Sequence, residues 1–142
     1  MHTVTGDQAN ASVLRRWRAE MSAAARESGG ASGFDAVIDD GGHKNSQLAA
    51  TFLAFWPEVR PGGVYFLEDL HVGYSSRYED TRGQAIMADV LQGWLAQLAG
   101  RAPPSDGGGG GPFAALRRLP AGVEFVACQP RACAVGKRRS RA

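Results

Sequence analysis

Two short apolar runs with a helical segment between them constrain the fold of this chain more than any other feature. Residues 34–38 (Phe-Asp-Ala-Val-Ile) and 64–67 (Val-Tyr-Phe-Leu) have the composition of buried strands, and residues 43–56 carry apolar side chains at helical spacing. A strand, a helix and a second strand within about 35 residues are typical of a βαβ unit. Such a unit has parallel strands, so the sequence predicts an α/β fold in which both runs end at the same edge of one sheet.

Both runs end in acidic residues that a histidine follows closely. Parallel strands are buried on both faces and tolerate unpaired carboxylates poorly, and ligands bind at the carboxyl-terminal edge of open α/β sheets. Each acid taken singly could also cap a following helix or pair with a surface lysine. The whole pattern favours a polar site built from both strand ends: Asp39, Asp40 and His43 after the first run, and Glu68, Asp69 and His71 after the second.

Carboxylates and an imidazole at one sheet edge suit a particular chemistry. Asp40, Glu68 and Asp69 supply hard oxygen ligands of the kind that Mg²⁺ accepts. A bound ion would lower the pKa of a coordinated hydroxyl, and His43 is placed to take its proton near neutral pH. His71 could face a substrate or lie in solvent as an ordinary loop residue.

The other segments surround this unit in a single domain of residues 1–142. A Pro-Gly-Gly turn at 61–63 precedes the second run, and residues 102–112, with a Pro-Pro pair and consecutive glycines, predict a flexible insertion. A basic tail occupies residues 137–142. The remaining predicted elements are a strand at 2–5, a helix at 11–27, a loop at 72–82, a helix at 83–98, and an antiparallel hairpin with strands at 123–128 and 132–136.

Composition narrows the partners and the setting. The net charge is only +2 and the basic tail holds four of the cations, which argues against a nucleic-acid face. Cys128 and Cys133 are too few for a disulfide framework or a zinc site, so we expect them to be reduced and buried in the hairpin. The first ten residues lack a signal-peptide pattern, and no apolar run approaches the ~20 residues of a membrane span. We therefore expect a cytoplasmic protein with no membrane partner.

The two strand-end segments resemble a known family in detail. Residues 34–43 read F-D-A-V-I-D-D-G-G-H, and residues 60–71 read R-P-G-G-V-Y-F-L-E-D-L-H. They are similar to F-D-x-I-I-D-D-G-S-H and L-x-P-G-G-x-Y-x-x-E-D-L in the metal-dependent sugar O-methyltransferases of the macrocin, mycinamicin and tetracenomycin type. This chain has Gly42 where the family has serine. The family consists of class I methyltransferases that use S-adenosylmethionine, and the resemblance covers their C-terminal half.

The resemblance implies a fold and a set of roles. The expected fold is a partial Rossmann-like class I methyltransferase sheet, with flanking helices and a C-terminal antiparallel hairpin. Asp40, Glu68 and Asp69 would bind Mg²⁺. His43 would act as the general base on the hydroxyl of a sugar or another small molecule.

The cofactor half of the family pattern is represented only in part. Asp7 and Gln8 look like the family's G-D-Q turn, near the adenine of S-adenosylmethionine. The family's first strand with its Gly-rich turn, and its second strand with the acid that binds the ribose, have no counterpart in the sequence. We therefore expect a sheet that lacks its first strands and leaves the strand at 34–38 as an exposed edge, which favours self-association.

Three functions are compatible with this pattern, and we rank them in order. The first is an S-adenosylmethionine-dependent, Mg-assisted O-methyltransferase acting on a sugar or other hydroxylated small molecule, represented by a truncated chain. The second is a non-catalytic methyltransferase-like module that binds a metal or a partner. The third is an Fe(II)-dependent hydroxylase of the cephalosporin hydroxylase-like group, because histidine and carboxylates also hold Fe(II).

Overall fold

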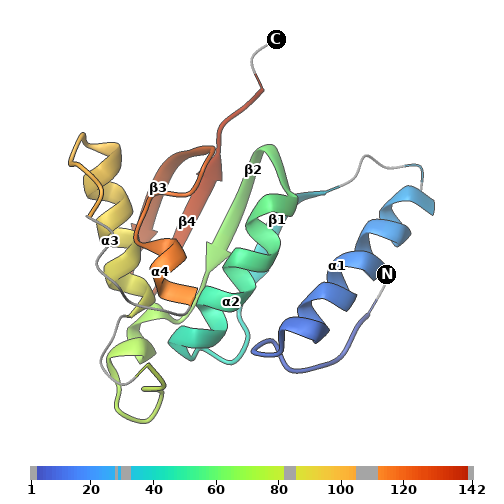
Figure 1. Ribbon diagram of the computed structural model, residues 1–142, viewed down its shortest axis with the longest axis horizontal. Coiled ribbons are helices and arrows are strands. Elements are labelled where there is room, and N and C mark those ends of the chain that lie inside the picture. The colour runs from blue at the N-terminus through green and yellow to red at the C-terminus, as the bar shows by residue number, and fades with distance from the viewer. Residues whose placement is uncertain (1–2, 28, 30–32, 82–85, 105–111, 141–142) are drawn as a thin grey trace.

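The computed structural model describes residues 3–27, 29, 33–81, 86–104 and 112–140. Four strands and several helices alternate along this part of the chain, as Figure 1 shows. In order they are α1 (Ala11–Glu27), β1 (Phe34–Asp39), α2 (Asn45–Phe55), the 3-10 helix η1 (Trp56–Glu58), β2 (Val59–Leu67), the 3-10 helix η2 (Leu70–Tyr74), α3 (Met87–Leu98), α4 (Pro112–Leu116), β3 (Val123–Gln129) and β4 (Ala132–Lys137).

The strands form one mixed sheet in the order β1-β2-β4-β3. β1 and β2 are parallel and in register at Asp39 and Leu67, so both end at the same edge of the sheet. β4 is antiparallel to β2 and pairs Cys133 with Leu67, and β3 completes the hairpin. The turn of the hairpin therefore lies at the same edge as the ends of β1 and β2. The predicted βαβ unit, the parallel pairing and the C-terminal hairpin are confirmed.

One face of the sheet is covered by α2, α3 and α4, because alternate strand residues point toward these helices. Phe52 of α2 lies at the centre of this core. Its ring centroid is 4.9 Å from that of Tyr65 on β2, 5.0 Å from that of Trp94 on α3 and 5.3 Å from that of Trp56. The Trp94 indole N–H donates to the carbonyl of Leu116 at 2.7 Å, which fastens α4 to α3.

The opposite face of the sheet keeps large apolar side chains in contact with solvent. Ile38 on β1 is 65% exposed, Phe66 on β2 is 38% exposed, and Phe125 on β3 is 42% exposed. Ile38 and Phe66 are register partners. The Phe125 ring lies over Gly136, where an added Cβ would come within 2.0 Å of Phe125 Cε1. α1 lies beside α2 at the β1 end of the sheet (Figure 1).

Several predicted boundaries differ from the structure. β2 begins at Val59 and runs through the Pro-Gly-Gly segment that predicted a turn. The register with β1 shifts between Phe34 and Ala36, so this segment bulges where Pro61 needs no amide hydrogen for the ladder. A Cβ on Gly63 would lie 2.8 Å from the carbonyl oxygen of Asp35, so the bulge needs glycine there.

The predicted ends of the chain also need comment. The prediction of a strand at 2–5 is wrong for the residues that the structure describes, because residues 3–5 belong to no strand. The helix at 11–27 is confirmed. α2 is shorter than the predicted 43–56, and α3 begins at Met87, after the extended residue Ile86. Residues 83–85 and most of the insertion at 102–112 lie outside the described residues, while Pro112 begins α4.

The expectation of two reduced, buried cysteines is wrong. Cys128 and Cys133 face each other across the hairpin with their Cα atoms 4.1 Å apart, and they form a disulfide. Cys133 is buried, but Cys128 is exposed. The hairpin register brings the two sulfur atoms together, and cysteine spacing alone does not give that register.

Lys137, the first residue of the predicted basic tail, belongs to the folded domain. Its Nζ donates to the carbonyls of Trp56, Pro57 and Val59 at 3.0, 3.2 and 2.7 Å. These carbonyls belong to η1 and to the first residue of β2, directly after the end of α2, where a cation is favourable. Partial burial lowers the pKa of the Lys137 ammonium, with the Glu58 carboxylate opposing the shift.

Among the helices that the structure describes, none is both long and apolar enough to cross a bilayer.

Candidate metal and base site

The end of β1 separates its two aspartates into different environments. Asp39 is only 5% exposed and Asp40 is exposed, because successive strand residues point to opposite sides. The Tyr65 hydroxyl donates to Asp39 Oδ2 at 3.1 Å, and Gln8 Nε2 donates to Asp39 Oδ1 at 3.3 Å. Burial raises the pKa of the Asp39 carboxyl, although these hydrogen bonds oppose the shift. Asp39 is thus a structural residue, and Asp40 is the one available to a ligand.

Gln8 holds the turn that follows β1. Besides its bond to Asp39, Nε2 donates to Thr51 Oγ1 on α2 at 3.2 Å, and Oε1 accepts from the amide of Gly42 at 2.8 Å. A Cβ on Gly41 would lie 1.8 Å from Gln8 Oε1. The backbone of the turn can therefore approach the Gln8 side chain this closely only because residue 41 is glycine. The side chain expected to meet the cofactor is therefore engaged with the protein itself.

Asp7, the other residue expected near the cofactor, lies in the exposed turn before α1. Its Oδ1 accepts from the amide of Ala9 at 2.8 Å, and its carbonyl accepts from the amide of Asn10 at 3.0 Å. These bonds shape the turn and leave the second carboxylate oxygen, Oδ2, free of any hydrogen bond among the described residues. The cofactor role of Asp7 and Gln8 stays a prediction.

Two of the predicted site residues have left-handed backbone conformations. His43 has φ 58° and Asp69 has φ 49°. Residues other than glycine rarely adopt this region, at a cost of about 1 kcal/mol or more each, and such residues concentrate at functional sites. The Asp69 conformation is supported on its C-terminal side, because the Leu70 amide donates to the carbonyl of Arg131 in the hairpin turn at 2.9 Å.

The structure brings Asp40, His43 and Asp69 together. One donor atom from each residue lies within 4.8 Å of the other two. His43 Nε2 is 3.7 Å from Asp69 Oδ2, and His71 Nδ1 is 3.7 Å from Asp69 Oδ1. The Asp69 carboxylate therefore lies between two imidazoles. We call Asp40, His43 and Asp69 the strand-end group.

Glu68 lies beside this group but outside it. Its side chain is half-buried, and its amide donates to the carbonyl of Asp39 at 3.0 Å, which extends the parallel ladder by one bond. That bond fixes the separation of the two strand ends. The part of Glu68 as a metal ligand stays a prediction.

The strand-end group fits a divalent cation on its own chemistry. It combines two carboxylates at least partly open to solvent with an imidazole, and His43 Nδ1 is buried with no hydrogen-bond partner among the described residues. Carboxylate oxygens suit Mg²⁺ and Mn²⁺, and an added imidazole also suits Fe(II) or Zn²⁺. The donor set therefore supports a metal site without fixing which metal occupies it.

Sequence reasoning missed the residues that fasten the surrounding loops. The buried side chain of Asn45 accepts from the amide of Met87 at 2.9 Å and donates to the carbonyl of Gly73 at 3.3 Å, joining α2, η2 and α3. Asp80 accepts from the amide and the hydroxyl of Ser46 in the first turn of α2. No motif marks these residues, although an asparagine at the start of a helix is a common capping signal.

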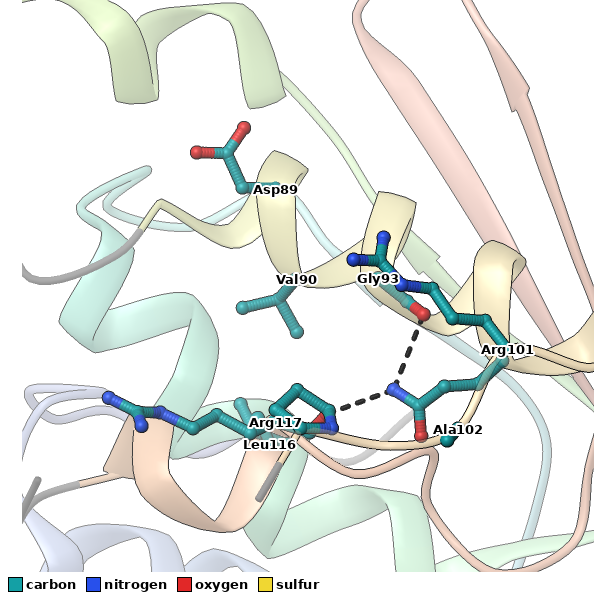
Figure 2. A pocket seen from close by; sticks show the side chains of 9 residues that line it. Asp89, Val90, Gly93, Arg101, Ala102, Leu116 and Arg117 are labelled. Carbon is teal, nitrogen blue, oxygen red and sulfur yellow. Dashed lines mark hydrogen bonds between the residues drawn. The ribbon is translucent and has the colours of Figure 1, made fainter. Parts of the chain in front are cut away.

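Several clefts lie around the part of the sheet that the structure describes. A cleft of about 470 Å³ runs along β1 and includes Gln8, Trp17, Ile38 and Asp40. A second, of about 340 Å³, lies between η2, α3 and the hairpin turn and includes His71. Figure 2 shows a third, of about 330 Å³, between α3 and α4, with Asp89 and Val90 on the α3 side and Leu116 and Arg117 on the α4 side. The third cleft includes no member of the strand-end group.

Comparison of sequences finds similar proteins for part of the chain. No protein-family model matches it. The mycinamicin VI 2''-O-methyltransferase of Micromonospora griseorubida is 42% identical over 74 residues, which are 52% of this chain and 16% of that protein. The demethylmacrocin O-methyltransferase of Streptomyces fradiae is 40% identical over 72 residues, or 51% of this chain and 16% of that protein. The 8-demethyl-8-alpha-L-rhamnosyl tetracenomycin-C 2'-O-methyltransferase of Streptomyces olivaceus is 35% identical over 98 residues, which are 69% of this chain and 23% of that protein.

Comparison of structures extends the likeness to nearly all of the chain. The MycE methyltransferase of the mycinamycin biosynthetic pathway, solved with Mg, SAH and mycinamycin VI, matches with a TM-score of 0.68 and 26% identity. The match covers 97% of this chain and 32% of MycE. The chain thus spans less than a quarter of these sequence relatives and about a third of the solved protein. In sequence and in fold, the chain resembles the mycinamicin, macrocin and tetracenomycin sugar O-methyltransferases, as its strand-end motifs predict.

Proposed function

We propose that this chain carries the metal and base residues of an S-adenosylmethionine-dependent, Mg-assisted O-methyltransferase that acts on a sugar or another hydroxylated small molecule. The observation that carries the proposal is the convergence of Asp40, His43 and Asp69 at the adjacent ends of two parallel strands. The relatives are named as O-methyltransferases, and MycE was solved with Mg and SAH. The cytoplasmic location expected from the sequence stays a prediction.

In this proposal Asp40, Glu68 and Asp69 hold the metal. Mg²⁺, when bound, supplies a Lewis acid that lowers the pKa of the acceptor hydroxyl. Glu68 follows the last residue of β2, and the bond from its amide to the carbonyl of Asp39 keeps its backbone beside the two strand ends.

His43 takes the proton. With S-adenosylmethionine bound, its methyl group would pass from sulfur to the acceptor oxygen, and His43 Nε2 would take the hydroxyl proton. Before the transfer, the ring is neutral and carries its one hydrogen on Nδ1, the buried nitrogen, so that Nε2 is free to accept. The Asp69 carboxylate, 3.7 Å from Nε2, stabilises the imidazolium that results.

For the cofactor we assign different parts to the two residues of the G-D-Q turn. Asp7 is exposed and offers a carboxylate oxygen to S-adenosylmethionine. Gln8 acts indirectly, because its amide is engaged with Asp39, Thr51 and Gly42, and it fixes the turn that carries Asp40.

One observation favours a second candidate function. The strand-end group includes the His43 imidazole beside Asp69 Oδ2, and His71 Nδ1 lies 3.7 Å from Asp69 Oδ1. Two histidines and a carboxylate are the ligands of many non-haem Fe(II) oxygenases. An Fe(II)-dependent hydroxylase is therefore the alternative to test.

Metal titration of matched variants separates the two functions. We expect Asp40→Asn, Glu68→Gln and Asp69→Asn each to weaken Mg²⁺ or Mn²⁺ binding by about tenfold or more, the order seen when metal-site partners are removed. His43→Gln should leave the affinity for Mg²⁺ within a few fold, because the proposed base is not a ligand. Calorimetry measures both.

The contrary results are equally specific. If His43→Gln abolishes metal binding while Glu68→Gln does not, the histidine is a ligand and the Mg²⁺ methyltransferase proposal fails in this form. Iron retained through purification, with turnover dependent on 2-oxoglutarate, would establish the alternative. Titration with S-adenosylmethionine in the presence of Mg²⁺ tests the cofactor directly.

A further inference from the structure

The hairpin formed by β3 and β4 holds the end of β2 at two places. Before the end of the strand, Leu67 is the register partner of Cys133 in the ladder between β2 and β4. Beyond it, the amide of Leu70 donates to the carbonyl of Arg131 at 2.9 Å. Residues 68–69, two of the proposed metal ligands, are therefore a short bridge between two attachments to the same hairpin.

The disulfide closes the part of the hairpin that makes both attachments. Cys128 and Cys133 are register partners, and one further pair separates them from the turn at Pro130 and Arg131. The covalent bond thus joins one attached residue, Cys133, to the opposite strand and encloses the other, Arg131. A change at the disulfide acts on both attachments at once.

The turn inside the disulfide has an unfavourable conformation. Arg131 has φ 74°, in a region that residues other than glycine rarely adopt. Proline followed by a residue of positive φ is the pattern of a type II turn. In hairpin loops of two residues, type II turns match the twist of the strands less well than the primed types do. The turn therefore depends on constraints from outside, of which the disulfide is the covalent one.

The disulfide is accessible from one end. Cys128 is exposed, whereas Cys133 is buried. One cleft beside η2 and α3 and another beside Phe66 both include the two cysteines. A thiol from solvent can therefore approach the disulfide from the Cys128 side. The chain is expected in the cytoplasm, where disulfides are usually transient and serve redox sensing or catalysis.

We propose that the Cys128–Cys133 disulfide is a reversible redox switch that sets the position of residues 68–69, and with it the affinity of the strand-end group for a divalent cation. The reductant is a dithiol. Its thiolate attacks Cys128 Sγ, the bond between the two cysteine sulfurs breaks, and Cys133 leaves as a thiolate that takes up a proton. The second thiol of the reductant then displaces Cys128. The reductant ends as a disulfide and the chain as two thiols, a transfer of two electrons and two protons.

The oxidised chain is the form that binds the cation more tightly. While the disulfide holds the turn, the Arg131 carbonyl stays in place as the acceptor for Leu70, and Asp69 keeps its φ of 49°. In the reduced chain the turn can relax, so Asp69 is no longer held beside Asp40 and His43. The proposal rests on the function proposed above, because it concerns the regulation of the same site.

Titration of Mn²⁺ into the oxidised and the reduced chain measures the switch. The chain is reduced with dithiothreitol and desalted under nitrogen, so that the dithiol does not bind the metal. We expect about three- to tenfold weaker Mn²⁺ binding in the reduced chain by calorimetry, at or below the lower end of the effect of removing a residue that positions a metal ligand. Without metal, amide NMR shifts should differ between the two forms at residues 68–70 as well as at 128–133.

Variants distinguish a switch from a general loss of stability. The double variant Cys128→Ser, Cys133→Ser should bind Mn²⁺ as the reduced wild type does, with no response to dithiothreitol. In Arg131→Gly, reduction should change the Mn²⁺ affinity by less than about twofold, because glycine adopts the positive φ of the turn without strain. Arg138→Gly is the matched control. It removes an exposed arginine outside the turn and should keep the wild-type response.

The contrary outcomes are distinct. Equal Mn²⁺ affinities of the oxidised and reduced wild type, or amide shifts confined to residues 128–133, would overturn the switch. A reduced Arg131→Gly chain that loses as much affinity as the wild type would also overturn it, because lost stability would then explain the effect. Absence of Mn²⁺ binding in both forms would overturn the proposed function, and the amide shifts at residues 68–70 would still decide whether the disulfide sets the position of that segment.

Discussion

The two faces of the sheet differ in what the chain itself supplies to cover them. On one face, Phe52, Tyr65 and Trp94 pack ring against ring between α2, β2 and α3. On the other, Ile38 and Phe66 stand side by side in solvent. The strand residues of the two faces, such as Tyr65 and Phe66, alternate along the same strands, so strand composition alone does not distinguish the faces.

This difference shows how the site and the sheet depend on different parts of the molecule. The covered face carries the contacts that fix the ends of β1 and β2, since Tyr65 donates to Asp39 and Asn45 joins η2 to α3. The contacts that position the two strand ends therefore come from the covered face.

The largest expected effect is on the covered face. Phe52→Ala removes the ring at the centre of the core and should lower the free energy of unfolding by about 3–5 kcal/mol. Phe66→Ala, a substitution of the same type on the open face, should lower it by about 1 kcal/mol or less. Urea unfolding measures both values. Equal losses would mean that the open face is packed in solution.

The disulfide tests whether packing alone holds the hairpin to the covered face. Replacing both Cys128 and Cys133 by serine should lower the free energy of unfolding by about 2 kcal/mol, the effect expected for a short closed loop. A reducing agent should lower the stability of the wild-type chain and leave the double variant unchanged. If the reducing agent has no effect on the wild type, the two cysteines are not linked in solution.

Asp39 gives the covered face a pH dependence. Burial raises the pKa of its carboxyl above the ordinary 3.8, so the folded state binds the proton more tightly than the unfolded state. The stabilising contribution is therefore fully present below the ordinary pKa and is lost as the pH rises through the raised folded pKa. Urea unfolding over this range should show a falling stability in the wild type.

Asp39→Asn is the matched control for that slope. Asparagine keeps an oxygen that accepts from the Tyr65 hydroxyl but does not titrate. The fall attributable to Asp39 should be absent in the variant. A slope that persists unchanged would mean that other groups cause it.

The smallest effect on stability, and the clearest on association, is expected on the open face. Replacing Ile38 and Phe66 together by serine should change the free energy of unfolding of the monomer by about 1 kcal/mol or less. It should also reduce the self-association expected for β1 as an edge strand, because Ile38 lies on that strand. Sedimentation at several concentrations measures this. A wild-type chain that stays monomeric at high concentration would count against the proposed association.

Much of the arrangement followed from local patterns. The helix at 11–27, the parallel strands and the hairpin are confirmed, because each is encoded by periodicity or by turn residues within a short segment. The bulge in β2 was not predicted, because Pro61 and the glycines beside it mark a turn equally well. The disulfide was not predicted, because it depends on which residues of the hairpin lie opposite each other.

The sequence by itself determined the order of the elements, the two acidic strand ends and the likeness to sugar O-methyltransferases, since these depend on residues close together in the chain. Tertiary structure decided the rest. It buried Asp39 against Tyr65 and engaged Gln8 with the turn after β1. It placed Asp69 between two imidazoles and joined the Arg131 carbonyl to the amide of Leu70, because contacts between distant segments depend on register and packing that no local pattern contains.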